Sequence, residues 1–239
     1  MKYISILNQK GGSGKTSFSV LVILALASEG KRVLAIDCDP QYGLSAILCP
    51  TEKVERLGLF ELLSGMSKID EVTMHVDRGG ITFDLIPSDY RLDSIVTSLD
   101  PFALKRKFKG LKRYDYIVFD TPPTVQGISR AAAMISDEIY IPSDISIPSL
   151  GPTMYTLKSL EDIEKTGNVV LVGFREPRED SKGYTDKITR EFLSKLNGTF
   201  KGSIPRNVTM AKAIADPETK WTAKKKEAVL QPILDILEI

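Results

Sequence analysis

Short apolar runs alternate with longer helical patterns along the whole chain. The apolar runs are rich in β-branched residues and bounded by polar or turn residues, which predicts buried strands at residues 3–7, 32–36, 81–86, 114–119, 138–142, 169–173 and 199–204. Between them, spacing and cap residues predict helices at residues 16–29, 57–63, 90–108 with a break at Pro101, 149–164 and from about 221. This alternation predicts an α/β fold, a doubly wound and mostly parallel sheet with helices on both faces.

A glycine-rich segment lies between the first apolar run and the long helix that follows it. The segment is Lys10-Gly11-Gly12-Ser13-Gly14-Lys15-Thr16. Glycines let backbone N–H groups converge on an anion, and the helix adds the positive end of its dipole. Lys15 can then reach the β- and γ-phosphates of a nucleotide, and the Thr16 hydroxyl can bind Mg²⁺. The usual P-loop pattern has a glycine where this chain has Gln9, so the segment is a variant P-loop led by Lys10.

Acidic residues follow two of the predicted strands. Asp37 and Asp39 come after the run at 32–36, and Asp120 ends the run at 114–119. The carboxyl ends of parallel strands meet at one edge of an open sheet, so we expect these carboxylates to lie beside the glycine-rich segment. An acid that ends an apolar strand at this place can hold the water shell of a magnesium ion. The sequence therefore predicts a site for a nucleotide phosphate and Mg²⁺.

Composition limits the other classes of function. The chain has 239 residues, of which 42% are hydrophobic and 26% charged, and we expect one α/β domain over residues 1–239 that contains the variant P-loop. A formal charge of +1 excludes a protein that binds nucleic acid by bulk charge, so only a local basic patch could do so. Two cysteines without metal-ligand spacing and one histidine exclude a zinc or histidine-centred site. Residues 18–27 are the most apolar segment and are about half the length that spans a bilayer.

Four motifs in a fixed order resemble those of the deviant Walker ATPases, specifically the ParA/Soj branch of the ParA/MinD superfamily used in plasmid and chromosome partition. They are the glycine-rich segment, Asp37-Cys38-Asp39-Pro40-Gln41, Asp120-Thr121-Pro122-Pro123 and Ile204-Pro205-Arg206-Asn207-Val208. The resemblance extends from the first strand to about residue 215. The chain departs from the family pattern at Ser17, which replaces a more usual threonine, at Tyr42-Gly43-Leu44, where a Gly-Asn pair is common, and at residues 175–180, which lack an expected asparagine.

The resemblance implies a role for each matching residue. Lys10 resembles the signature lysine that reaches across a nucleotide-sandwich dimer to the partner's phosphates. Lys15 resembles the in-chain lysine, and Asp39 resembles the acid that positions the attacking water, so these three are the expected catalytic residues. The expected nucleotide-binding residues are Lys10, Gly11, Gly12, Ser13, Gly14, Lys15, Thr16, Ser17, Pro205 and Asn207, the last two in the loop that contacts adenine. The expected metal site comprises Thr16, Asp37 and Asp120.

The resemblance also implies an ATPase that requires ATP and Mg²⁺ and forms a homodimer when ATP binds. Such a dimer binds non-specific double-stranded DNA, is released by hydrolysis, and works with a centromere-binding, ParB-like adaptor protein. We expect a cytoplasmic, nucleoid-associated protein without an N-terminal DNA-reading domain. Basic residues are frequent in the C-terminal third, and those expected to contact DNA are Arg206, Lys220, Lys224, Lys225 and Lys226.

Two other functions remain open from the sequence. A MinD-like positioning ATPase would bind a membrane through a C-terminal amphipathic helix. Pro232 interrupts that helix, and Asp235 and Glu238 would face anionic lipid poorly, which favours a helix that packs on the core and predicts no membrane partner. A metabolic P-loop enzyme, such as a small-molecule kinase or an amidoligase-type synthase, would need an acceptor pocket. No second cluster of polar residues indicates such a pocket.

Overall fold

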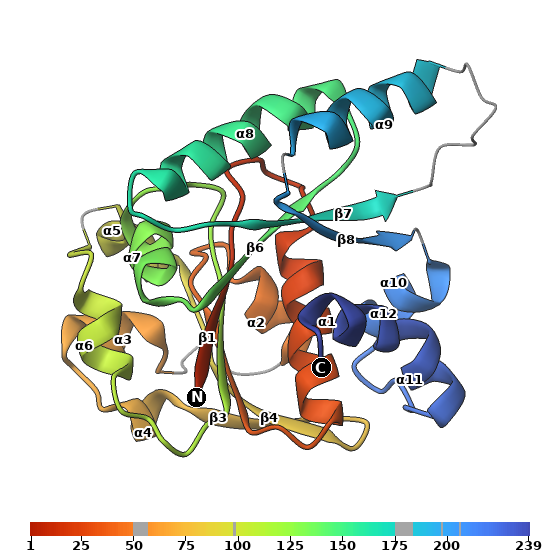
Figure 1. Cartoon of the computed structure of the whole chain (residues 1–239). Coiled ribbons are helices and arrows are strands. Elements are labelled where there is room, and N and C mark those ends of the chain that lie inside the picture. Colours follow the sequence, from red (N-terminus) through yellow and green to blue (C-terminus); the bar gives the residue numbers. More distant parts are fainter. Residues whose placement is uncertain (50–56, 98, 175–183, 197, 206) are drawn as a thin grey trace.

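An eight-stranded sheet forms the centre of the molecule (Figure 1). The computed structural model describes residues 1–49, 57–97, 99–174, 184–196, 198–205 and 207–239. The strand order is β3-β4-β2-β5-β1-β6-β7-β8, and every neighbouring pair is parallel except β3 and β4. The strands are β1 (Lys2–Ile6), β2 (Val33–Asp37), β3 (Met74–Arg78), β4 (Ile81–Ile86), β5 (Tyr116–Asp120), β6 (Glu138–Ser143), β7 (Asn168–Phe174) and β8 (Phe200–Pro205).

Helices cover both faces of this sheet, as a doubly wound fold requires. Alternate residues of β2 show the two faces, because Val33 and Ala35 pack with α1 and α2, whereas Leu34 and Ile36 pack with α3, α6 and α7. A third cluster joins α8 and α9 to β6 and β7. The α-helices are α1 (Lys15–Ser28), α2 (Gly43–Leu48), α3 (Leu59–Ser64), α4 (Ile69–Val72), α5 (Asp93–Val96), α6 (Ala103–Phe108), α7 (Gly127–Ile135), α8 (Ile147–Glu161), α9 (Tyr184–Lys195), α10 (Val208–Ala215), α11 (Ala223–Val229) and α12 (Gln231–Leu237).

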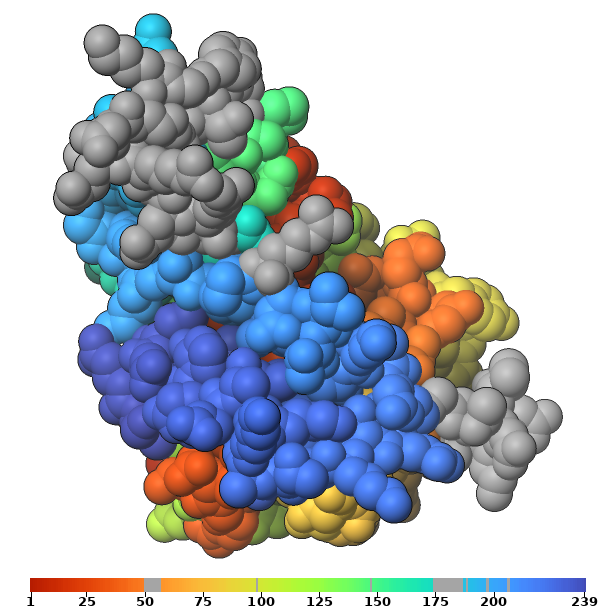
Figure 2. All heavy atoms as spheres, turned by 90° about the vertical axis from the view of Figure 1, so that its right-hand side faces the viewer, coloured from red at the N-terminus to blue at the C-terminus, as the bar shows by residue number. Residues whose placement is uncertain are grey.

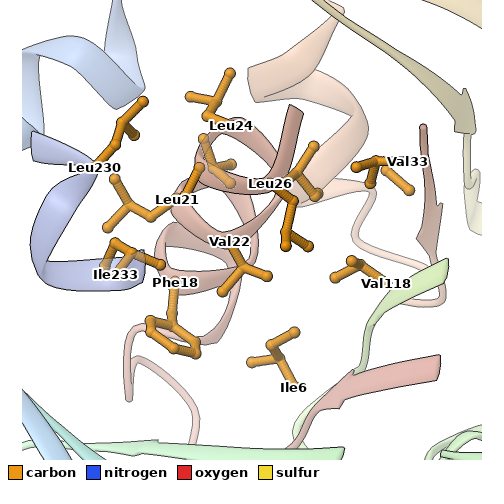
Figure 3. Packing of buried hydrophobic residues seen from close by; sticks show 14 of the residues in the cluster. Ile6, Phe18, Leu21, Val22, Leu24, Leu26, Val33, Val118, Leu230 and Ile233 are labelled. Carbon is orange, nitrogen blue, oxygen red and sulfur yellow. The ribbon is translucent and has the colours of Figure 1, made fainter. Parts of the chain in front are cut away.

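Helix α1 is buried on nearly every side, as its continuous apolar sequence predicts. Figure 3 shows Leu21 near Leu230 and Ile233 of the C-terminal segment, while Ile6 of β1 and Val118 of β5 approach the same helix from the sheet. Burying one such side chain contributes roughly 1.5–3 kcal/mol to folding. Because α1 starts at the glycine-rich segment, this packing fixes the position of that segment.

The C-terminal residues pack on the core. Helix α11 ends at Val229 and α12 begins at Gln231, so the predicted interruption near Pro232 is confirmed. Ile233 is fully buried, and Leu234, Ile236 and Leu237 are each at most 6% exposed. The apolar face of α12 is therefore covered by the protein, as the sequence favoured. Among the described residues, no helix combines the length and the apolar composition needed to cross a membrane.

The structure differs from the sequence-based elements in several places. Strand β3 was not predicted, because it is an antiparallel edge strand whose residues His75 and Asp77 face solvent. The sequence analysis also missed helices α2, α4, α7, α9 and α10. The predicted helix at 90–108 is divided into a 3₁₀ turn (Tyr90–Leu92), α5 and α6, with the break at Pro101 as expected.

Candidate nucleotide-binding site

The glycine-rich segment connects β1 to α1. Gly12 and Gly14 have φ angles of 70° and 87°, in the left-handed region where a side chain would be strained. A Cβ atom added at Gly11 or Gly12 would meet nothing within 4 Å. Gly14 is the N-cap of α1, so the first backbone N–H groups of the helix point to the same side. This geometry suits an anion such as a phosphate.

Two buried polar groups in this segment lack full hydrogen-bond partners. Lys15 is only 7% exposed, and its Nζ donates to the carbonyl oxygen of Lys10 at 3.1 Å. Burial lowers the pKa of Lys15, and the nearby carboxylates of Asp120 and Asp39 oppose that shift. The Ser13 hydroxyl is buried and has no partner within the described part of the chain. Phosphate oxygens would supply the missing acceptors, so the residues present fit a nucleotide phosphate.

Asp120 joins the glycine-rich segment to the carboxyl end of β5. Its Oδ2 accepts a hydrogen bond from the Thr16 hydroxyl at 2.9 Å, and its Oδ1 accepts one from the Ser19 hydroxyl at 2.7 Å. Burial raises the pKa of Asp120. Thr16 and Ser17 both lie in the first turn of α1, so helix and strand place a hydroxyl and a carboxylate side by side. Hydroxyl and carboxylate oxygens are ligands that suit Mg²⁺.

Asp37 lies directly opposite Asp120 where β2 and β5 end. Its Oδ2 accepts from the backbone N–H and the hydroxyl of Ser45, at 2.8 and 2.6 Å, and its Oδ1 accepts from the backbone N–H of Asp39 at 3.1 Å. Burial, followed by repulsion from Asp120, raises the pKa of Asp37. A cation would favour the charged form of both carboxylates. Within the described residues no group of three or more acidic, His or Cys side chains could hold a metal ion.

Lys10 is held within its own chain. Its Nζ lies 2.7 Å from Oδ1 of Asp144 and 2.6 Å from the Ser149 hydroxyl, at the junction of β6 and α8. The Lys10 side chain is 25% exposed and that of Asp144 is 43% exposed. The buried side chain of Asn8 accepts from the backbone N–H of Lys10 at 2.9 Å and donates to Pro142. Lys10 therefore has a defined position at the surface of the site.

The predicted adenine-contacting residues, Pro205 and Asn207, lie at the same edge of the sheet as the glycine-rich segment, where the parallel strands end. Val172 of β7 is the neighbour that a Cβ on Gly14 would meet, at 3.5 Å, and Val172 pairs with Ile204 of β8. Pro205 ends β8. Asn207 is the N-cap of α10, where its Oδ1 accepts from the backbone N–H groups of residues 209 and 210. In the sheet, β6 and β7 lie between β8 and β1, the strand that leads into the glycine-rich segment.

The predicted DNA-contacting lysines lie away from this cluster, on the C-terminal segment. Lys220 and Lys224 are exposed, Lys225 and Lys226 are half-buried, and none forms an ion pair with another described residue. Figure 2 shows that α10, α11 and the segment between them, in blue, form a continuous part of one face of the molecule. Arg206 and residues 175–180 fall outside the described residues.

Sequence reasoning missed four polar residues that hold the site together, namely Ser19, Ser45, Asp144 and Ser149. The sequence contains an indication of Ser19, because it is a polar residue within the apolar sequence of α1. The indication for Asp144 was weaker: it follows a predicted strand, at the edge of the sheet where ligands bind. The sequence gives no indication of Ser45 or Ser149, because Asp37, the partner of Ser45, lies eight residues away and Lys10, which donates to Ser149, lies 139 residues away.

Comparisons with known proteins agree with this geometry. A family model described as an AAA domain matches residues 1–172. An uncharacterized protein of Methanocaldococcus jannaschii is 30% identical and covers 96% of this chain and 95% of its own length. The chromosome partitioning protein ParA of Caulobacter vibrioides is 26% identical, covering 89% of this chain and 84% of its own.

A solved structure shares the fold. A plasmid partition protein from Borrelia burgdorferi bound to AMPPNP superposes with a TM-score of 0.78 at 24% identity, over 99% of this chain and 96% of the other. The eight-stranded sheet, the variant P-loop and the ParA relative agree with one another. The chain therefore belongs to the AAA-domain family and, within the P-loop NTPases, to the ParA/MinD superfamily of partition ATPases.

Proposed function

We propose that this chain is an Mg²⁺-dependent ATPase of DNA partition, for a plasmid or a chromosome, which dimerises on ATP and binds non-specific DNA as the dimer. The observation that carries the proposal is the cluster around the variant P-loop. A buried Lys15, a Thr16–Asp120 pair and Asp37 lie together, and a second lysine, Lys10, leads the same segment. Hydrolysis then releases the dimer from DNA. A ParB-like adaptor stimulates it, and the protein is cytoplasmic and nucleoid-associated.

Phosphoryl transfer requires positioning and charge neutralisation more than covalent chemistry from the protein. Lys15 and the backbone N–H groups of residues 11–15 would neutralise the phosphates, and Thr16, Asp37 and Asp120 would hold Mg²⁺, which would supply further positive charge to the phosphate oxygens. Asp39 orients the attacking water. The partner subunit's copy of Lys10 completes the positive surroundings, so the rate depends on dimerisation.

The contacts of Lys10 with Asp144 and Ser149 bear directly on this mechanism. A lysine that reaches across an interface has to leave them first, so the ion pair within one chain stabilises the monomer. An exposed or half-exposed ion pair contributes roughly 1 kcal/mol or less. The free energy of dimerisation would change by about that amount if the ion pair were removed.

We expect Asp144→Asn to promote dimerisation. The substitution removes the charge that holds Lys10 and keeps the size of the side chain, so half-maximal dimerisation should require up to about fivefold less ATP, the ratio that corresponds to roughly 1 kcal/mol. Light scattering over an ATP titration measures the ATP concentration at which half of the protein is dimeric. Asp235→Asn, on the exposed side of α12, is the matched control and should not differ from the unmodified chain. A requirement for more ATP in Asp144→Asn would show that Asp144 assists the dimer instead.

DNA binding is expected to depend on the lysines of the C-terminal segment. Two subunits side by side present twice the cations to one duplex, so weak phosphate contacts add up. We expect the double variant Lys220→Glu/Lys224→Glu to bind DNA at least tenfold more weakly, with ATP hydrolysis in the absence of DNA unchanged. Filter binding at low salt measures the affinity, and binding by the unmodified chain should weaken steeply as salt rises.

The control for this experiment is Lys105→Glu/Lys109→Glu, which makes the same change of charge at exposed positions on and beside α6. If both double variants lose affinity equally, the effect is one of overall charge and not of the C-terminal segment. If neither does, these lysines are not the DNA contacts.

A further inference from the structure

Arg78, the last residue of β3, is a buried arginine outside the nucleotide-binding cluster. It is only 2% exposed. Its Nη1 donates to the carbonyl oxygen of Ile47, and its Nη2 donates to those of Ile214 and Asp216 at 3.1 and 2.9 Å, with a longer contact to Ala213 at 3.4 Å. Arg78 forms no ion pair with a carboxylate among the described residues.

The carbonyl groups that Arg78 binds are the ends of two helices. Ile47 is in the last turn of α2, and the other three are at the end of α10. The last carbonyls of a helix lack partners within the helix and carry its partial negative charge. One guanidinium group therefore satisfies both helix ends and connects them. A lysine has a single ammonium group and would not span both.

These two helices begin on different sides of the nucleotide-binding cluster. Helix α2 carries Ser45, which holds Asp37, and its Gly43 packs against Thr16, since a Cβ there would lie 3.6 Å from Cγ2 of Thr16. Helix α10 begins after Asn207 at the predicted adenine side. Arg78 thus joins the C-terminal ends of α2 and α10. Helix α2 contacts the expected metal site, and α10 begins beside the residues expected to contact adenine.

The turn after Arg78 touches the lysine-bearing segment as well. Gly79 has a φ of 63°, and a Cβ there would lie 2.1 Å from the carbonyl oxygen of Thr219 and 3.2 Å from Trp221. Only glycine allows this approach. Lys220 lies between those two residues, so the β3–β4 hairpin contacts the chain on both sides of a predicted DNA-contacting lysine.

We infer that Arg78 is a positioning residue that makes α2 and α10 move together, so that nucleotide and Mg²⁺ at Asp37 affect residues 208–226. The buried Nε of Arg78 has no hydrogen-bond partner within the described part of the chain. Burying a cation costs free energy of folding, and an apolar residue of similar volume often stabilises the folded protein equally well. A buried arginine at this position therefore favours a role beyond stability. The link from α2 to α10 rests on nucleotide binding, and only its extension to DNA rests on the proposed partition function.

Hydrogen exchange with and without Mg·ATP tests the inference and needs no DNA. In the unmodified chain, Mg·ATP should slow exchange at residues 43–48 and at 208–226. In Arg78→Lys and in Arg78→Met, which fills the space without charge, the change at 43–48 should remain and that at 208–226 should fall at least threefold. Arg113→Lys is the control, because Arg113 forms an exposed ion pair with Asp70 and contacts neither helix. It should behave as the unmodified chain does.

Three results would overturn the inference. The first is full protection of 208–226 by Mg·ATP in both Arg78 variants. The second is no response of 208–226 in the unmodified chain. The third is failure of both variants to fold, which would make Arg78 a residue of stability only. Unchanged DNA binding in the charge-reversal experiment would contradict the proposed DNA contacts and leave the exchange result unaffected, so the two proposals fail separately.

Discussion

Replacing Lys15 by alanine should abolish ATP binding. The Lys15 ammonium group is buried at the centre of the glycine-rich segment, and its hydrogen-bond partner among the described residues is the carbonyl oxygen of Lys10, so the phosphates would be its main counter-charge. Hydrogen bonds between charged groups in such a place contribute roughly 1.5–3 kcal/mol each, so we expect affinity to fall about 100-fold or more. Calorimetry with Mg·ATP measures the loss, and thermal unfolding checks that the variant is folded.

Lys10→Ala is the matched variant, because it removes the same group from the same segment. Lys10 is bonded to Asp144 and Ser149, and its proposed target belongs to the partner subunit. Lys10→Ala should therefore keep much of the ATP affinity while losing dimerisation and stimulated hydrolysis. Equal losses of affinity in the two variants would show that Lys10 contacts the nucleotide of its own chain.

The second large effect is expected from Asp39→Ala. Asp39 follows β2 next to Asp37, and its carboxylate accepts a hydrogen bond from the backbone N–H of Gln41 at 2.9 Å. Removing a group that orients or activates the attacking water typically lowers the rate about 10²- to 10⁴-fold. ATP should still bind, because Lys15, Thr16 and Asp120 are unchanged. The dimer should then accumulate, since hydrolysis is the step that separates it.

Light scattering with saturating Mg·ATP tests the trapped dimer. Asp39→Ala should have twice the mass of the chain with ATP and the monomer mass with ADP. A variant that hydrolyses ATP at the unmodified rate would remove Asp39 from the mechanism. A variant that stays monomeric with ATP would contradict the nucleotide-sandwich dimer.

The sequence predicted the elements that local patterns determine. The strands β2, β5 and β6 were recognisable because their residues are nearly all buried and read as continuous apolar runs, and β4 was recognisable because buried apolar residues alternate with polar ones at its start. The glycine-rich segment and Asp120 were recognisable because a strand, a loop and a helix follow one another there. The alternation of strands and helices predicted a doubly wound, mostly parallel sheet, and the structure confirms it.

The parts that were missed depend on contacts between distant residues. The ion pair of Lys10 with Asp144 joins residues 134 positions apart. Arg78 stands beside Asp77 and two glycines, a pattern typical of an exposed turn, and only the tertiary structure places it against α2 and α10. Neither contact has a signature in composition or periodicity.

The most direct test of the account is DNA retention by the hydrolysis-deficient chain. Asp39→Ala would be mixed with double-stranded DNA of arbitrary sequence at low salt, once with Mg·ATP and once with Mg·ADP, and assayed by gel shift. We predict retention with ATP, little or none with ADP, no preference for sequence, and loss of retention as salt rises. Absence of retention with ATP, or equal retention with both nucleotides, would contradict the proposed partition mechanism.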